Sequence, residues 1–294
     1  MLNYSKIAIV TSFFGLWIES FLSHQIQMWL GFVLIFSFCI LHGANDITLI
    51  ENISSKKNIT KYSNILFNYL TIVLLGVGLF YIMPWVALTL FILVSGYHFG
   101  EQQWINQIHS VEKWLKFSFE LLYGLVILFL VFYFNVSEVQ QIVFAITSKN
   151  IQYFHIALGL KVIATLLIFF GILLYFKSTD FRYFIIKELF YLIVFTIIFK
   201  ASSLIWGFAI YFIIWHSIPS MQDQIQFLYG KLNFENCKLY FRKAFPYWIA
   251  SLIGIVILHY IFKDQKIFNA LFFSFLASIT FPHVIVIIKM FNKE

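Results

Sequence analysis

Charged residues are scarce in this chain of 294 residues, since Asp, Glu, Lys and Arg together make up only 11% of it. A soluble domain carries about 25% charged residues, so this shortage excludes an ordinary water-soluble fold. Apolar residues instead reach 61%, and the mean hydropathy is +0.87. We therefore predict an integral membrane protein.

Other features that the sequence lacks argue against several classes of protein. Two cysteines are too few for a disulfide framework. No two histidines lie within four residues of each other, which argues against membrane di-iron desaturases and intramembrane zinc proteases. The net charge of +7 is spread over many connections, so it does not indicate nucleic-acid binding. Lys289 lies at the end of the last apolar run, which is the wrong place for the retinal-binding lysine of a rhodopsin.

Long apolar runs dominate what is present. A helix needs about 20 apolar residues to cross the bilayer core. We read ten such spans without repeats or linkers, which predicts an all-α transmembrane bundle with residues 1–294 as one domain. The spans are 6–22, 27–49, 64–82, 84–100, 114–134, 153–176, 183–199, 201–218, 246–262 and 268–290, with the longest polar connection over 219–243.

The basic residues predict the orientation. Most of the 20 Lys and Arg residues fall in connections on the side of the N-terminus when ten spans are assumed. Cytoplasmic connections carry an excess of Lys and Arg. We therefore expect a multi-pass protein of the inner (cytoplasmic) membrane with both termini in the cytoplasm.

Four histidines fall in the cytoplasmic half of this arrangement. His42, His98 and His216 each end a span that runs toward the cytoplasm, and His283 lies on the last span. Any one of them is most simply an interfacial or hydrogen-bonded histidine. Together they are harder to explain in that way, because ionisable groups within spans are costly and usually mark function. Imidazole suits iron, zinc and copper, so the four predict one metal site.

Two carboxylates accompany these histidines. Asp46 follows His42 by four residues and shares its helical face if the helix continues that far. Glu101 follows His98 by three residues. Metal-bound histidines commonly donate their second N–H to a carboxylate, so both acids are candidate catalytic partners, more readily of a histidine on a neighbouring helix than of their own. Nearby glycines permit close helix packing, with or without a metal site; they are Gly43, Gly96 and Gly100.

Four stretches resemble the signature sequences of the Brp/Blh family, membrane-embedded β-carotene 15,15′-dioxygenases. They are LHGAND (41–46), YHFGE (97–101), IYFIIWHS (210–217) and TFPHVIVI (280–287). The resemblance implies non-haem Fe(II) as cofactor, with His42, His98 and His216 as iron ligands. It also implies O₂ as co-substrate, cleavage of the central double bond of β-carotene into two retinal molecules, and a rhodopsin as recipient of the product.

Three positions depart from the family pattern. Ser220 stands where the family usually has a second histidine, Gln103 where it tends to have Asp, and Leu41 where it usually has Pro. Either His283 completes the iron site, or three histidines suffice, or the chain is a divergent relative. The first alternative makes His283 our fourth predicted metal ligand.

Aromatic residues make up 21% of the chain. Most of them are expected to fill the bundle, but those beside the motifs are candidates for lining a tunnel for an apolar polyene that arrives from the bilayer. These candidates are Tyr97, Phe99, Trp104, Tyr211, Phe212, Trp215 and Phe281.

The leading hypothesis is thus an Fe(II)- and O₂-dependent carotenoid-cleaving dioxygenase that forms retinal. One alternative is another non-haem-iron membrane oxygenase that acts on a different isoprenoid or lipid, which Ser220 and Gln103 keep open. A second alternative is a metal or proton transporter. We rank it lower because the polar residues within spans gather in one half of the bilayer rather than through its full depth.

Overall fold

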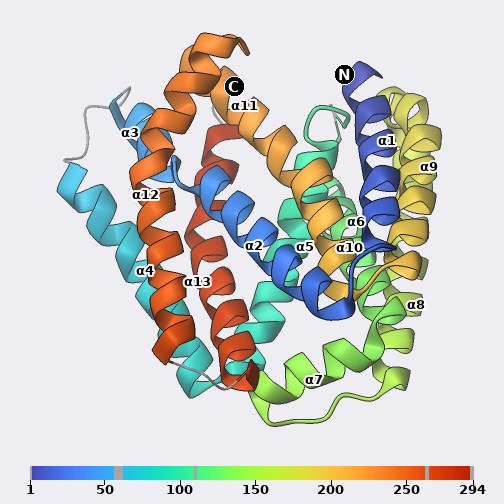
Figure 1. The fold of residues 1–294 in the computed structure, drawn as a ribbon. Coiled ribbons are helices and arrows are strands. Elements are labelled where there is room, and N and C mark those ends of the chain that lie inside the picture. The colour runs from blue at the N-terminus through green and yellow to red at the C-terminus, as the bar shows by residue number, and fades with distance from the viewer. Residues whose placement is uncertain (1, 56–61, 109–110, 262–264, 292–294) are drawn as a thin grey trace. The chain divides into compact units, whose positions relative to one another are not determined.

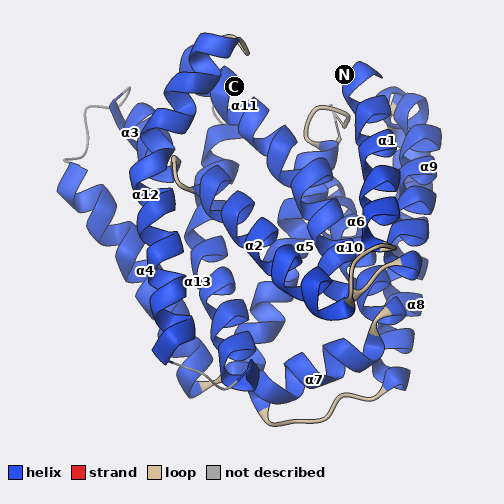
Figure 2. Cartoon of the chain, in the orientation of Figure 1, coloured by secondary structure: helices blue, strands red, loops and turns tan. Residues whose placement is uncertain are grey.

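The protein is almost entirely helical. The computed structural model describes residues 2–55, 62–108, 111–261 and 265–291, and within these residues there is no strand (Figure 2). The all-α prediction is therefore confirmed. The helices are α1 (Leu2–Glu19), α2 (His24–Gly43), α3 (Asp46–Ser55), α4 (Tyr62–Ile82), α5 (Pro84–Trp104), α6 (Lys113–Phe134), α7 (Val136–Thr147), α8 (Tyr153–Lys177), α9 (Thr179–Ala201), α10 (Leu204–Ile210), the π-helix η1 (Tyr211–Ser217), α11 (Ile218–Tyr229), α12 (Phe234–Ile261) and α13 (Gln265–Phe291).

Within the described residues each predicted span is largely helical, but two of the spans are not one regular α-helix. The span predicted over 27–49 breaks after Gly43, and a new helix begins at Asp46. The span predicted over 201–218 changes from α-helix to π-helix at Tyr211. The polar connection 219–243 is also mostly helical, because α11 and the first part of α12 occupy it.

Among the described residues, five segments are long and apolar enough to cross a membrane. They are His24–Ile53, Lys113–Phe134, Tyr153–Lys177, Leu204–Tyr229 and Ser274–Phe291. This supports a membrane protein. Crossing by ten spans, cytoplasmic termini and a single domain remain predictions.

The chain divides into two compact units. The first unit comprises Met1–Phe32, Ile92–Phe144 and Ser148–His216, and the second comprises Val33–Phe91, Ala145–Thr147 and Ser217–Glu294. In the first unit α6 packs along α8 and α9, and α1 lies against α9 and α10 (Figure 1).

Glycines bring α5 and α6 of the first unit into backbone contact. A Cβ on Gly100 would lie 1.7 Å from the carbonyl oxygen of Glu120, and a Cβ on Gly124 would lie 1.8 Å from that of Gly96. Neither position accepts a side chain without a shift of the helices. The spacing of Gly96 and Gly100 is the small-xxx-small pattern by which membrane helices approach closely, so these glycines serve helix packing.

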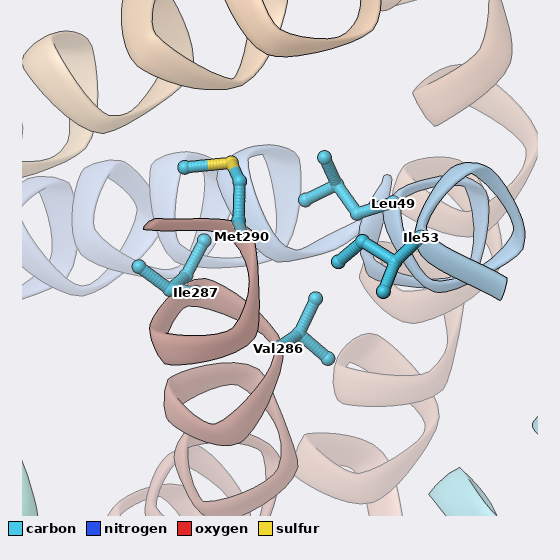
Figure 3. Packing of buried hydrophobic residues seen from close by; sticks show 5 residues of the cluster. All are labelled: Leu49, Ile53, Val286, Ile287 and Met290. Carbon is cyan, nitrogen blue, oxygen red and sulfur yellow. The ribbon is translucent and has the colours of Figure 1, made fainter. Parts of the chain in front are cut away.

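In the second unit α13 packs along α4, and α3 lies across the end of α13 (Figure 1). Figure 3 shows the buried cluster that joins α3 to α13; its members are Leu49, Ile53, Val286, Ile287 and Met290. The cluster fixes α3 immediately after Asp46, and its partner α13 carries His283.

Candidate metal centre

The second unit contains a pair of buried histidines. His42 is the penultimate residue of α2, and His283 lies on α13 directly after Pro282. Each side chain is 3% exposed. Their ring centroids are 4.6 Å apart with the ring planes nearly perpendicular, and one ring nitrogen of each lies within 4.8 Å of the other. Both rings are thus close enough to offer ligands to one ion.

Hydrogen bonds decide which nitrogen of each ring carries the proton. Nδ1 of His42 lies 3.0 Å from the carbonyl oxygen of Phe38. Nδ1 of His283 lies 2.9 Å and 3.1 Å from the two carboxylate oxygens of Asp46. Carbonyl and carboxylate oxygens accept only, so Nδ1 is the donor in both rings. In the neutral imidazole the lone pair then belongs to Nε2, the form that binds a metal.

Asp46 serves a histidine of another helix. The helix that carries His42 ends at Gly43, so Asp46 is not on its face; it is the first residue of α3. Besides His283, its carboxylate accepts a hydrogen bond of 3.0 Å from the hydroxyl of Tyr69 on α4. Asp46 is 1% exposed. A histidine backed by a hydrogen-bonded carboxylate is the usual arrangement behind a metal ligand.

A buried polar network closes the end of α2. The amide nitrogen of Gln224 donates to the carbonyl oxygen of His42 at 3.0 Å and to Oγ of Ser220 at 3.2 Å. The hydroxyl of Tyr240 lies 2.8 Å from Oε1 of Gln224 and 3.3 Å from the same carbonyl oxygen. Burial raises the pKa of the Tyr240 hydroxyl, which therefore stays a neutral donor. The last carbonyls of a helix lack intrahelical partners, and this network supplies one for His42.

The first unit contains a second pair. His98 lies on α5 and His216 in the π-helix η1, and they are 1% and 2% exposed. Their ring centroids are 4.7 Å apart, with the planes at 82°. The rings of Phe99 and Phe212 lie 4.7 Å and 5.4 Å from that of His216. Two imidazoles thus lie together, with two phenylalanine rings packed against that of His216.

Glu101, the other predicted carboxylate, accepts a 3.2 Å hydrogen bond from the hydroxyl of Tyr97. Gln103, two residues further on, donates to Glu188 of α9 at 2.6 Å. Tyr123 and Gln107 donate to the same carboxylate, each at 3.2 Å. Glu188 is completely buried. An amide therefore stands at position 103 and a carboxylate faces it from another helix.

The predicted lining residues fall into several groups. Phe99 contacts the ring of Tyr211 at 5.5 Å, and with Phe212 these residues lie near the second histidine pair. Trp104 belongs to a separate cluster and stacks on Phe181 at 5.2 Å. The others lie apart: Tyr97 faces Phe117, Trp215 faces Tyr191 and Phe195, and Phe281 lies against Gly76. Their contact with a substrate remains a prediction.

Comparison with known protein families shows to which family the chain belongs. A family model described as beta-carotene 15,15'-dioxygenase matches residues 33–291. The chain belongs to this family. It is accordingly a carotenoid-cleaving dioxygenase, as the four histidine motifs predict. Comparison with curated proteins and with solved structures finds no match. His42, His98, His216 and His283 all lie within the matched region.

Buried histidines of this dioxygenase, among them His42, His98 and His283, could bind a metal ion, because imidazole is a common metal ligand. Sequence reasoning did not find the residues that support them, namely Tyr69, Gln224 and Tyr240. Tyr69 is one aromatic residue in an apolar run, and nothing local distinguishes it. Gln224 does carry a signal, because a glutamine four residues after Ser220 places two polar groups on one helical face.

Proposed function

We propose that the protein is an inner-membrane, Fe(II)- and O₂-dependent enzyme that cleaves the central double bond of β-carotene into two molecules of retinal. His42, His98, His216 and His283 are its iron ligands. Membership of the dioxygenase family supports the reaction class. The observation that carries the metal assignment is the buried pair His42–His283, in which both Nδ1 atoms face acceptors. All four proposed ligands are 3% exposed or less.

The proposed ligands form a set of neutral nitrogen donors, which suits a divalent iron ion. When bound, the ion supplies the activation of O₂ that side chains alone do not provide. The carbonyl of Phe38 and the carboxylate of Asp46 hold the two rings in the ligating tautomer. Asp46 in addition brings one negative charge against a centre whose histidines are neutral, and Tyr69 holds that carboxylate in place.

Serine at position 220 fits this proposal. The side chain is 2% exposed and accepts a hydrogen bond from Gln224. It therefore belongs to the network that holds the carbonyl of His42 rather than offering a nitrogen ligand. We propose that His283 takes the place of the missing fourth histidine, with Asp46 behind it.

The proposed substrate is an apolar polyene that enters from the bilayer. Phe99 and Phe212 lie against His216, and Tyr211 packs on Phe99, so aromatic side chains line this side of the second histidine pair. Aromatic side chains of this kind exclude water and orient a conjugated chain. Correct placement of the reacting bond is the protein's main contribution to the reaction. The other proposed lining residues are Tyr97, Trp104, Trp215 and Phe281. The retinal formed would supply a rhodopsin.

Expression in a bacterium that accumulates β-carotene tests this function. The wild-type chain should bleach the cells and yield retinal in the extract, and His42→Ala should do neither. His155→Ala is the matched control, because His155 is exposed at the start of α8, where its Nδ1 accepts from the backbone N–H of Gln152. Unchanged colour with well-expressed, iron-supplied protein would contradict the proposal. A different cleavage product identified by mass spectrometry would favour the oxygenase of another isoprenoid.

A further inference from the structure

Helix α1 lies before the region that the family model matches, which begins at residue 33. One stripe of α1 nevertheless bonds to the segment that leads to His216. The stripe consists of Tyr4, Ala8, Ser12, Gly15 and Glu19, which are spaced three or four residues apart and so share a face. Ala8 and Ser12 are 1% and 0% exposed.

The end of the stripe nearest Glu19 holds the start of α10. Oε1 of Glu19 accepts a 2.9 Å hydrogen bond from the backbone N–H of Ser203. The carbonyl oxygen of Gly15 accepts one of 3.1 Å from the indole nitrogen of Trp206. A Cβ on Gly15 would lie 3.1 Å from Ile210, so the helices are close here.

The other end holds the π-helix η1. Oγ of Ser12 accepts a 2.9 Å hydrogen bond from the indole nitrogen of Trp215 and donates to the carbonyl of Ala8 at 2.7 Å. The hydroxyl of Tyr4 donates to the carbonyl oxygen of Ile214. Glu19 and Gly15, late in α1, bond to Ser203 and Trp206, whereas the earlier residues Ser12 and Tyr4 bond to Trp215 and Ile214, so the two segments run roughly antiparallel. The bonded residues Ile214 and Trp215 directly precede His216.

A π-helix needs such support. It is rare and mostly occurs as short insertions at functional sites. Its hydrogen bonds run over five residues rather than four, so seven consecutive residues in this register are not favoured by the backbone alone. Bonds from a separate helix to the carbonyl of Ile214 and the indole of Trp215 select this register over a regular α-helix.

We propose that α1 is a clamp that keeps η1 in its π-helical register and thereby fixes the position of His216. Ser12 and Tyr4 are positioning residues for this ligand. This inference rests on the proposed function, because it assigns His216 to the metal.

Ser12→Ala tests the clamp, since it leaves the indole N–H of Trp215 without its acceptor and changes no proposed ligand. Ser12→Thr retains the hydroxyl and should therefore keep the Fe(II) affinity and the hydrogen exchange of the wild type. Ser20→Ala is the matched control, because Ser20 is exposed directly after α1 and its hydroxyl donates to the carbonyl of Trp17. Tyr4→Phe is an independent second variant. Affinity for Fe(II) is measured by chelator competition, and hydrogen exchange of residues 211–217 is measured on the metal-free full chain.

Ser12→Ala and Tyr4→Phe should weaken Fe(II) binding on the order of tenfold, as loss of a supporting bond behind a ligand does, and should speed exchange of residues 211–217. Ser12→Thr and Ser20→Ala should match the wild type. Wild-type affinity in both Ser12→Ala and Tyr4→Phe, or unchanged exchange in both, would overturn the clamp alone. A wild-type chain that binds no Fe(II) would instead overturn the proposed function.

Discussion

At the scale of single residues, His42 and His283 depend on what their Nδ1 atoms contact. A ring whose Nδ1 donates to a carbonyl or a carboxylate presents the Nε2 lone pair outward. The acceptor for Nδ1 of His42 is the carbonyl of Phe38, four residues back on its own helix. The acceptor for Nδ1 of His283 is Asp46 on another helix. The two proposed ligands thus have hydrogen-bond partners of different charge, and only the partner of His283 is supplied by tertiary structure.

Tyr69→Phe tests the chain from Tyr69 through Asp46 to His283. The variant removes the donor to a buried carboxylate and nothing else. We expect Fe(II) affinity to fall about tenfold or more, within the range for residues that support a ligand. Tyr81→Phe is the control, because Tyr81 lies on the same helix and is 90% exposed. Equal affinities of the two variants would show that Tyr69 does not support the ligand.

The sequence singles out the proposed ligands more readily than the residues that support them. Three histidines at span ends and a fourth within the last span are visible in the motifs, because an ionisable residue stands out in an apolar run. Asp46 also stands out, although its partner is 237 positions away along the chain. Tyr69 and Gln224 do not, since their roles arise only when helices distant in sequence pack together.

At the scale of helices, backbone contact between α5 and α6 sets the position of His98, which lies between Gly96 and Gly100. Gly100→Ala would place a methyl group 1.7 Å from the carbonyl oxygen of Glu120, and backbone does not yield easily. Overpacking of this kind costs about 1–3 kcal/mol or more. We expect a lower melting temperature and reduced iron content.

Gly78→Ala is the matched control for this prediction. It lies on α4, and among the described residues an added Cβ would meet no heavy atom within 4 Å apart from its chain neighbours and its own helix backbone. The substitution should be neutral or stabilise by up to about 1 kcal/mol, because alanine is the better helix former. Thermal unfolding in detergent compares the two variants; equal melting temperatures would contradict the close packing of α5 and α6.

Helix positions follow from the sequence more reliably than helix type. α5, α6 and α8 begin within one residue of the predicted starts at 84, 114 and 153, because apolar runs define them. The π-helical register of η1 was not predicted, since it depends on bonds from α1. Short helices such as α3 and α7 were not predicted because neither is long enough to span the bilayer.

At the scale of the whole molecule, the proposed ligands come from both units. His98 and His216 belong to the first and His42 and His283 to the second. The proposed function assigns both pairs to one ion. That assignment distinguishes it from a protein with two independent histidine sites, in which loss of one pair leaves the other filled.

Iron content of the purified chain and of two single variants tests this claim most directly. The wild type should hold about one iron atom per chain, as expected of a mononuclear site. His98→Ala and His283→Ala, which alter different pairs, should each reduce the iron content to nearly none while the helical content stays unchanged. A wild-type chain without iron, or full iron occupancy in either variant, would contradict the single shared centre.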